Sequence, residues 1–321
     1  MKAAVFYKYG SPEVLKIEDI AKPQPGEHEI LIKVHATAVN SGDVRIRKAD
    51  PFGVRLFFGL LKPKYRTLGS VYSGVVERTG AGVKNFKVGD AVYGHTNMRF
   101  GAYAEYIRVK EDSTVALKPA SLSHQQVASV PFGALTALHF MRKADIQPGQ
   151  KVLIIGASGA VGSAALQLAK AQGAVVTGVC STNNVSLVNE IGADSVIDYN
   201  KSDFTKSAER YDVVMDTVNK ESVSRCKQVL EPKGTLILSA AGMKEMFQGM
   251  RVSMSGGRKF VAGVTAHNKN NLQYISQLIE EGKYKSVVDR IYTLDAIAEA
   301  HAYTEQGHKR GNVVIDVAPT S

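Results

Sequence analysis

The sequence "GASGAVG", residues 156–162, lies near the middle of a 321-residue chain and decides its fold. An apolar, β-branched run, "KVLII" (151–155), precedes it, and a segment with apolar residues at helical spacing follows it as far as Gly173. A second apolar run, "AVVTGV" (174–179), comes next. The pattern predicts a strand, a glycine turn, a helix and a second strand, which is the unit that binds dinucleotides.

The turn needs small residues because its backbone must approach a pyrophosphate, which the free N–H groups and the positive dipole at the helix start then bind. Read strictly, the pattern is A-x-G-x-x-G, because Ala157 stands where the first glycine of G-x-G-x-x-G would be. A turn that serves packing alone is the alternative. We expect cofactor contacts from Ala157, Ser158, Gly159, Ala160, Val161 and Gly162.

The residues after the second strand indicate which nicotinamide cofactor is used. In NAD-binding units an acidic residue about 20 positions after the glycine turn bonds the ribose 2′-hydroxyl. Here Cys180 occupies that place and "STNN" (181–184) follows, so NADPH is expected in preference to NADH, although this loop holds no Arg or Lys. The same stretch could also cap the next helix. The expected contacts are Ser181, Thr182 and Asn183.

Strand-like runs then continue at 195–199, 211–218, 234–240 and 259–265, separated by helical or loop segments. This alternation predicts an α/β fold with a doubly wound parallel sheet, which binds its ligand at the carboxyl ends of the strands. Tyr199 is expected at the adenosine phosphate end. Further cofactor-lining positions are Thr217, Val218, Ser239, Ala240, Val264 and Thr265.

Composition restricts the class of protein. Two cysteines, Cys180 and Cys226, cannot build a disulfide framework, and no secretion signal is recognised at the start, so a cytoplasmic location is expected. Val152–Ala169 lacks charge over a spanning length, but its glycines favour a strand, turn and helix instead. The net charge is +10, yet the basic residues are scattered, so no nucleic-acid partner is expected.

The region before the glycine turn reads as a mainly β domain, and motifs along the whole chain carry a resemblance. They are "KPQPGEHEILIKVHATAVNSGDV" (22–44), "GSVYSGVVERTGAGVKNFKVGDAVYG" (69–94), "GAYAEYIRV" (101–109), "VPFGALTALHFM" (130–141) and "RGNVVIDV" (310–317). Together they resemble the medium-chain dehydrogenase/reductase superfamily, and more narrowly its zinc-independent quinone oxidoreductase branch, the relatives of zeta-crystallin.

The resemblance implies a GroES-like catalytic domain built from residues 1–120 and 287–321 and a Rossmann NAD(P)-binding domain over 121–286. It also implies a homodimer joined through an edge strand of the cofactor domain. An NADPH-binding protein with little turnover, in a sensor, crystallin-like or nucleic-acid-binding role, is the alternative function.

The metal-ligand positions of the superfamily carry other residues in this chain. Zinc-dependent members hold zinc with a Cys, a His followed by Glu, and a second Cys, and the matching positions here are Asn40, Ser70 followed by Val71, and Phe132. None of these replaces a thiolate or imidazole, so no metal is expected. Without a Lewis acid, an alcohol is a poor substrate, whereas hydride transfer to a quinone or an α,β-unsaturated carbonyl needs only hydrogen-bond donors.

The resemblance also places three candidate catalytic residues. Asn40 is expected to face the nicotinamide or the substrate oxygen, with a turn cap as the alternative. Asp43 is expected to anchor the loop or orient a proton path, and Thr136 matches a threonine near the nicotinamide.

Residues 50–69 combine aromatic and basic side chains. Three interpretations stay open: an apolar lid over a planar or long-chain substrate, weak peripheral contact with anionic lipid, and plain packing on the domain. The residues assigned to the lid are Phe52, Phe57, Phe58 and Tyr65.

Overall fold

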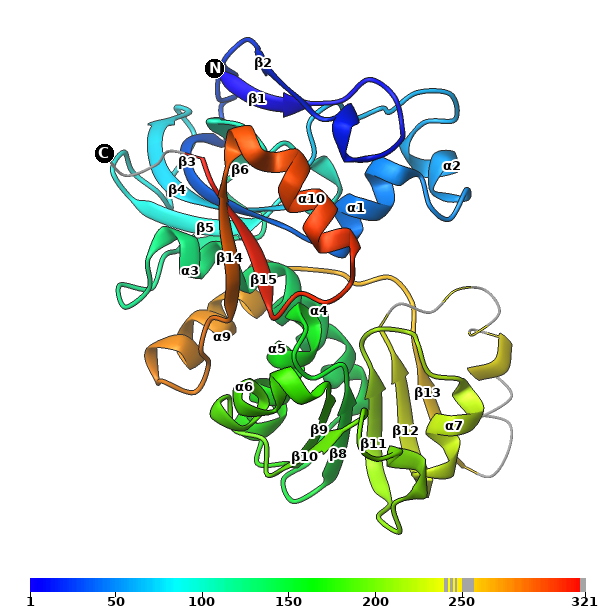
Figure 1. Ribbon diagram of the computed structural model, residues 1–321. Helices are drawn as coiled ribbons and strands as arrows, with labels where there is room; N and C mark the ends of the chain where they lie inside the picture. The colour runs from blue at the N-terminus through cyan, green and yellow to red at the C-terminus, as the bar shows by residue number, and fades with distance from the viewer. Residues whose placement is uncertain (240–241, 243–244, 246, 250–256, 318–321) are drawn as a thin grey trace. The chain divides into compact units, whose positions relative to one another are not determined.

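The computed structural model describes residues 1–317 except 240–241, 243–244, 246 and 250–256 (Figure 1). The chain forms two compact units. The first comprises Met1–Phe132, His267–Glu280 and Ser286–Ser321, and the second comprises Gly133–Ala266 and Glu281–Lys285. These limits differ from those expected at residues 120 and 287. Helix α3 (His124–Ala128) belongs to the first unit because it packs against strands β3, β4 and β15.

A seven-stranded sheet in the order β14-β15-β3-β4-β5-β7 forms the first unit, with β6 also pairing with β3. Strand β15, from the C-terminal end of the chain, runs antiparallel to β3, so both ends of the chain build one sheet. The strands are β3 (Glu29–Val39), β4 (Val71–Thr79), β5 (Ala91–His95), β6 (Tyr106–Lys110), β7 (Val115–Leu117), β14 (Val288–Thr293) and β15 (Asn312–Asp316). A separate antiparallel pair joins β1 (Lys2–Val5) to β2 (Lys16–Asp19).

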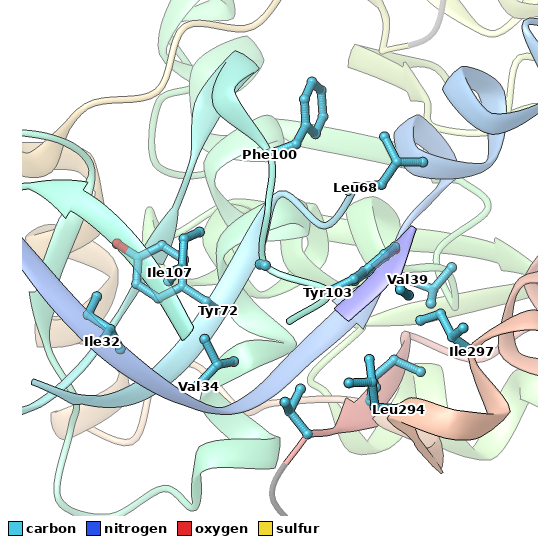
Figure 2. Close-up of a cluster of buried hydrophobic side chains, with 14 of the residues drawn as sticks. Ile32, Val34, Val39, Leu68, Tyr72, Phe100, Tyr103, Ile107, Leu294 and Ile297 are labelled. Atoms are coloured by element: carbon cyan, nitrogen blue, oxygen red, sulfur yellow. The ribbon is translucent and has the colours of Figure 1, made fainter. Parts of the chain in front are cut away.

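The core of the first unit lies between this sheet and the segment around helix α10 (Ile297–Glu305). Figure 2 shows Ile32 and Val34 of β3 near Tyr72 of β4, with Leu294 and Ile297 contributed by the C-terminal part of the chain. All five side chains are buried. Each large apolar side chain that is fully buried contributes roughly 1.5–3 kcal/mol, so residues from opposite ends of the chain stabilise the same core.

Short helices complete the first unit. Helix α1 (Ser41–Lys48) follows β3 directly, and α2 (Val54–Phe58) follows α1. The others are α9 (Lys269–Glu280) and the 3-10 turns η1 (Pro12–Val14), η2 (Asn97–Arg99) and η5 (Leu294–Ala296). Helix α4 (Val130–Ala144) begins in the first unit's segment of chain and continues into that of the second.

The second unit is a six-stranded sheet in the order β10-β9-β8-β11-β12-β13, and every neighbouring pair is parallel. This confirms the doubly wound α/β fold, and the strand order reverses between β8 and β11. The strands are β8 (Lys151–Ile155), β9 (Val175–Cys180), β10 (Ser195–Asp198), β11 (Tyr211–Asp216), β12 (Leu230–Leu238) and β13 (Lys259–Val261). The helices are α5 (Ala160–Ala171), α6 (Val185–Glu190) and α7 (Val223–Gln228), with 3-10 turns η3 (Thr182–Asn184) and η4 (Phe204–Lys206).

One strand expectation is revised, and one is confirmed. The run at 259–265 is a strand only as far as Val261, because Gly263 has φ +124° and an extended strand cannot continue through that conformation. The apolar stretch 152–169 divides into β8, the glycine turn and most of α5, as expected. Among the helices of the described ranges, none combines the length and apolarity needed to cross a membrane.

Candidate active site

The glycine turn joins β8 to α5 at the point where the strand order reverses. Gly156 has φ +80°, and a Cβ there would lie 2.7 Å from Val218 Cγ1 and 2.8 Å from Thr217 Oγ1, so only glycine fits. Gly159 is the N-cap of α5, followed by Ala160 and Val161. The N–H groups of this first helical turn have no acceptor within the helix and are free to bind an anion.

The two later glycines of the motif are small for different reasons. A Cβ on Gly162 would lie 2.0 Å from the Gly156 carbonyl oxygen, so the helix can approach the turn only without a side chain. A Cβ on Gly159 would meet only that same oxygen, at an ordinary 3.5 Å, and the Gly159 φ of −80° suits any residue. Packing therefore explains Gly162, whereas no packing within the described residues explains Gly159.

Behind the turn, Ala157 is fully buried and donates its backbone N–H to the Val179 carbonyl at 3.0 Å. Ser158 Oγ accepts a hydrogen bond from Asn184 Nδ2 at 2.9 Å, and both side chains are buried. Asn184, which directly follows the predicted contact Asn183 and was not itself predicted, thus ties the end of β9 to the glycine turn. Its only signal in the sequence was its place in the "STNN" loop.

The loop after β9 holds the residues expected near the ribose 2′ position of the cofactor, and it lies beside Asp198, which was not predicted. Ser181 precedes η3 without using its side chain as a cap, and Tyr199 donates its backbone N–H to the Cys180 carbonyl at 3.0 Å. Thr182 Oγ1 donates to Asp198 Oδ2 at 2.7 Å. Asp198, on the neighbouring strand β10, is the register partner of Cys180. A carboxylate therefore lies beside Cys180, the position where NAD-binding units carry their acidic residue.

The surroundings of Asp198 favour its charged form. Partial burial opposes its charge, but hydrogen bonds from the Thr182 hydroxyl and the Asn200 backbone N–H, with Lys201 Nζ at 3.8 Å, hold its pKa below the usual range. Asn183 is exposed at the edge of this loop. The loop therefore presents hydroxyls, an amide, a lysine and a negative charge at the end of β10.

The remaining strand ends vary in how well they match expectation. Thr217 Oγ1 donates to the Ile155 carbonyl at 2.8 Å, beside the glycine turn, and Val218 is exposed. Ser239 donates its backbone N–H to the Asp216 carbonyl. Val264 and Thr265 lie beyond the end of β13, with Val264 89% exposed, and Ala240 falls outside the described residues.

Asp216, which was not predicted as a site residue, shapes the loop after β11. Its buried carboxylate accepts the backbone N–H groups of Val218, Asn219 and Glu221. Burial raises its pKa, and the three backbone hydrogen bonds oppose that shift. Asp216 therefore holds the Val218 backbone beside the glycine turn.

In the first unit, Asn40 directly follows β3 and caps α1. Its Oδ1 accepts the backbone N–H groups of Gly42 and Asp43, and its Nδ2 donates to Asp43 Oδ2 at 2.6 Å and to Ser70 Oγ at 2.8 Å. Both amide hydrogens are therefore used inside the unit, and only 3% of Asn40 is exposed. The structure shows the capping role, while Ser70 accepts from Asn40 and keeps its own hydroxyl hydrogen for another acceptor.

Asp43 is fully buried, and its Oδ2 collects three donors. These are the Asn40 amide, the Asn40 backbone N–H at 3.4 Å and the Tyr103 hydroxyl at 2.9 Å. Burial raises the pKa of Asp43 to about 7, and the Tyr103 hydroxyl and the nearby backbone N–H groups of Asn40 and Gly69 oppose this rise. Oδ1 has no hydrogen-bond partner within the described chain, so a proton at that atom would break none of these bonds.

A buried cation fixes helix α1 in place. Arg47, fully buried, donates to the Glu305 carboxylate of α10 and to the Gly10 carbonyl, each at 2.6 Å, and its Nε donates to His301 Nδ1 at 3.3 Å. Removing one partner of such a pair would leave a buried charge unpaired. The position of Asn40 thus rests on α10 as well as on β3.

The three positions that hold zinc in metal-dependent relatives do not fit a zinc ion in this chain. Asn40 and Ser70 are hydrogen-bonded to each other, and the Phe132 ring, 3.9 Å from where a Cβ on Gly42 would lie, offers no donor atom. The carboxylate of Asp43 faces hydrogen-bond donors. Within the described ranges, no group of three His, Cys, Asp or Glu side chains could hold a metal.

The remaining predicted residues are Thr136 and the four residues assigned to a lid. Thr136 lies on α4 in the second unit and is 7% exposed, whereas Asn40 and Asp43 belong to the first unit. Of the four residues assigned to a lid, Phe58 and Tyr65 pack with Phe100 against the core, at ring-centroid distances of 5.8 and 5.3 Å. Phe52 and Phe57 are 66% and 77% exposed.

Comparisons with known proteins agree with this architecture. Residues 26–119 match the alcohol dehydrogenase GroES-like domain family, and residues 191–315 match a family described as zinc-binding dehydrogenase. The chain is 34% identical over 331 residues to the 2-methylene-furan-3-one reductase of Solanum lycopersicum, covering 99% of this chain and 80% of that protein. It is 32% identical to the chloroplastic NADPH-dependent alkenal/one oxidoreductase of Arabidopsis thaliana, with the same coverage.

Among solved structures, the quinone oxidoreductase of Coxiella burnetii superposes with a TM-score of 0.88 at 31% identity, covering 99% of each chain. The two-unit fold and the glycine turn at the strand-order reversal define a nicotinamide-dependent oxidoreductase. The chain belongs to the medium-chain dehydrogenase/reductase superfamily, in the branch that contains the quinone and enone oxidoreductases.

Proposed function

We propose that this protein is an NADPH-dependent reductase that transfers hydride to a quinone or an α,β-unsaturated carbonyl without a metal ion. One observation carries the proposal: the three zinc-ligand positions of the superfamily hold an amide, a hydroxyl and a phenyl ring, and the first two are bonded to each other. Relatives named as an alkenal/one oxidoreductase and a quinone oxidoreductase support the substrate class.

Bound NADPH would supply the hydride, and the residues of the chain supply binding and charge stabilisation. Reduction of a conjugated carbonyl builds negative charge on its oxygen, which a fixed hydrogen-bond donor stabilises. We assign this donor to the Ser70 hydroxyl and make Asn40 its positioning residue, because the Asn40 amide has no hydrogen left to donate. Asp43, held by Tyr103, orients the Asn40 amide. Thr136 would contact the nicotinamide.

The glycine turn and the β9 loop would bind the cofactor. The first turn of α5 would hold the pyrophosphate, since Gly159 leaves open space where a side chain would stand. Ser181, Thr182, Asn183 and Lys201 favour a 2′-phosphate, while Asp198 opposes it. We therefore propose a moderate preference for NADPH over NADH.

Two further parts of the proposal rest on the family and on composition. We propose a homodimer joined through an edge strand of the second unit's sheet, where the edges of the described sheet are β10 and β13. Static light scattering tests this, and a monomer at micromolar concentration contradicts it. We also propose a reducing, cytoplasmic location, in keeping with free, buried Cys180 and Cys226, which cell fractionation tests.

Steady-state NADPH oxidation with a panel of quinones and alkenals tests the activity. We expect turnover with at least one of these classes and none with simple alcohols in the reverse direction. Tight NADPH binding without turnover of any panel member would instead favour a binding protein, in a sensing, crystallin-like or nucleic-acid-binding role.

A further inference from the structure

The segment 51–66, which contains α2 and which we call the α2 segment, exposes large apolar side chains. Figure 1 shows α2 set apart from the seven-stranded sheet, beyond α1. Leu61 is 89% exposed, and four more large side chains are at least half exposed. These are Phe52, Leu56, Phe57 and Leu60. Contiguous apolar exposure of this kind marks an interaction surface.

One side of the α2 segment packs against the core of the first unit, so its exposed apolar side chains lie on an anchored segment. Phe58 and Tyr65 pack with Phe100 against the core. Tyr9 donates its hydroxyl to the Gly59 carbonyl at 2.7 Å, where Gly59 turns the chain at φ +116°. The segment thus has an anchored inner face and an outward apolar face.

The charged side chains within the α2 segment are all basic, and exposed Asp50 directly precedes the segment. Residues 51–76 contain no Asp or Glu, and the α2 segment carries Arg55, Lys62, Lys64 and Arg66. Lys62, Lys64 and Arg66 are exposed. Leucine and phenylalanine at the centre with lysine and arginine around them is the pattern that inserts into the headgroup region of an anionic bilayer.

We infer that the α2 segment binds the surface of an anionic lipid bilayer, with Leu56, Phe57 and Leu61 entering the interface and Lys62 and Lys64 meeting the headgroups. A second copy of this chain fits less well, because a two-fold contact would bring the same positive charges together. The surface lies in the first unit and does not depend on the proposed reductase activity.

Vesicle flotation tests this inference with the full chain. Phosphatidylcholine vesicles containing about 30% phosphatidylserine should bind the protein, and pure phosphatidylcholine vesicles should not. The variant Leu56→Gln/Leu61→Gln keeps the charge and removes apolar surface, and Lys62→Glu/Lys64→Glu reverses charge. Each is expected to weaken binding by at least about tenfold. Neither pair belongs to the residues assigned to cofactor or substrate.

Matched controls come from another exposed loop of the same unit. Val88→Gln removes an apolar side chain that is 62% exposed, and Lys84→Glu/Lys87→Glu reverses two exposed charges. Both controls should bind vesicles like the parent protein, and melting temperatures should be unchanged in all four variants. The inference would be overturned in favour of a general basic surface if the leucine variant bound vesicles like the parent protein. It would also be overturned if the control variants weakened binding as much as the α2-segment variants. Failure to bind anionic vesicles would also overturn it.

Discussion

Asn40 Nδ2 lies 2.6 Å from Asp43 Oδ2, and this contact joins the cap of helix α1 to a fully buried carboxylate. The Tyr103 hydroxyl donates to the same oxygen from a strand-flanking loop 60 residues away. The arrangement fixes the amide hydrogen that points to Ser70.

Asp43→Ala should lower kcat by about tenfold or more, because it removes the oxygen that accepts from Asn40 and Tyr103 and so leaves the Asn40 amide free to turn away from Ser70. The KM for NADPH should change little, since the predicted cofactor residues belong to the other unit. Any inflection near pH 7 in the kcat profile of the parent protein should vanish in the variant. Ser70→Ala serves as the comparison: it should lower kcat and keep that inflection. An unaltered kcat in both variants would contradict the assignment.

Asp43 should also make stability depend on pH. Its pKa is raised by burial to about 7 in the folded state, above the ordinary value that it has when unfolded. The contribution of Asp43 to stability is therefore fully present below about pH 4 and is lost as pH rises to and beyond 7. The melting temperature of the parent minus that of Asp43→Asn should fall between pH 4 and pH 8. A difference that is flat with pH would show that the carboxyl does not titrate in this range.

Exhaustive chelation should leave turnover unchanged, because the Asn40, Ser70 and Phe132 positions offer no zinc donor set. The measurement is the rate of NADPH oxidation before and after treatment with EDTA, with elemental analysis of the purified protein. Loss of the rate, restored by added zinc, would refute the metal-free proposal.

Gly159→Val and Gly162→Ala should separate binding from packing. At Gly159 a side chain meets open space, so valine should cost less than about 1 kcal/mol of stability but weaken NADPH binding by at least about tenfold, which corresponds to 1.4 kcal/mol. At Gly162 the added Cβ would lie 2.0 Å from the Gly156 carbonyl oxygen, so alanine should lower stability by about 1–3 kcal/mol. Melting temperature and NADPH dissociation constant are measured for both. An unchanged dissociation constant in Gly159→Val would place the pyrophosphate elsewhere.

Asp198→Asn should shift cofactor preference toward NADPH by about tenfold, because it removes a negative charge beside Thr182. Asp194→Asn is the matched control, since Asp194 pairs with Lys170 at 2.8 Å just before the start of β10, whereas Asp198 ends that strand. The ratio of NADPH to NADH dissociation constants reports the effect. Equal shifts in the two variants would show that general charge, and not the position of Asp198, sets the preference.

Local sequence patterns were enough to predict the strands and the helix around the glycine turn of the second unit. The apolar run 151–155, the glycine turn and the helix ending before Gly173 each follow from periodicity and backbone conformation within a few residues. The strand ending at Cys180 was also predicted from its sequence. Short-range signals of this kind act before any tertiary contact forms, so they can be read without the structure.

The contacts that give the sites their chemistry arise between elements far apart in the chain. Asp198 stands beside Thr182 because of the β10–β9 register, and Tyr103 reaches Asp43 across 60 positions. Gly159 and Gly162 look alike in the sequence, and only the position of the Gly156 carbonyl oxygen distinguishes them. Strand pairing and close packing set these distances, and neither is encoded in any one local stretch.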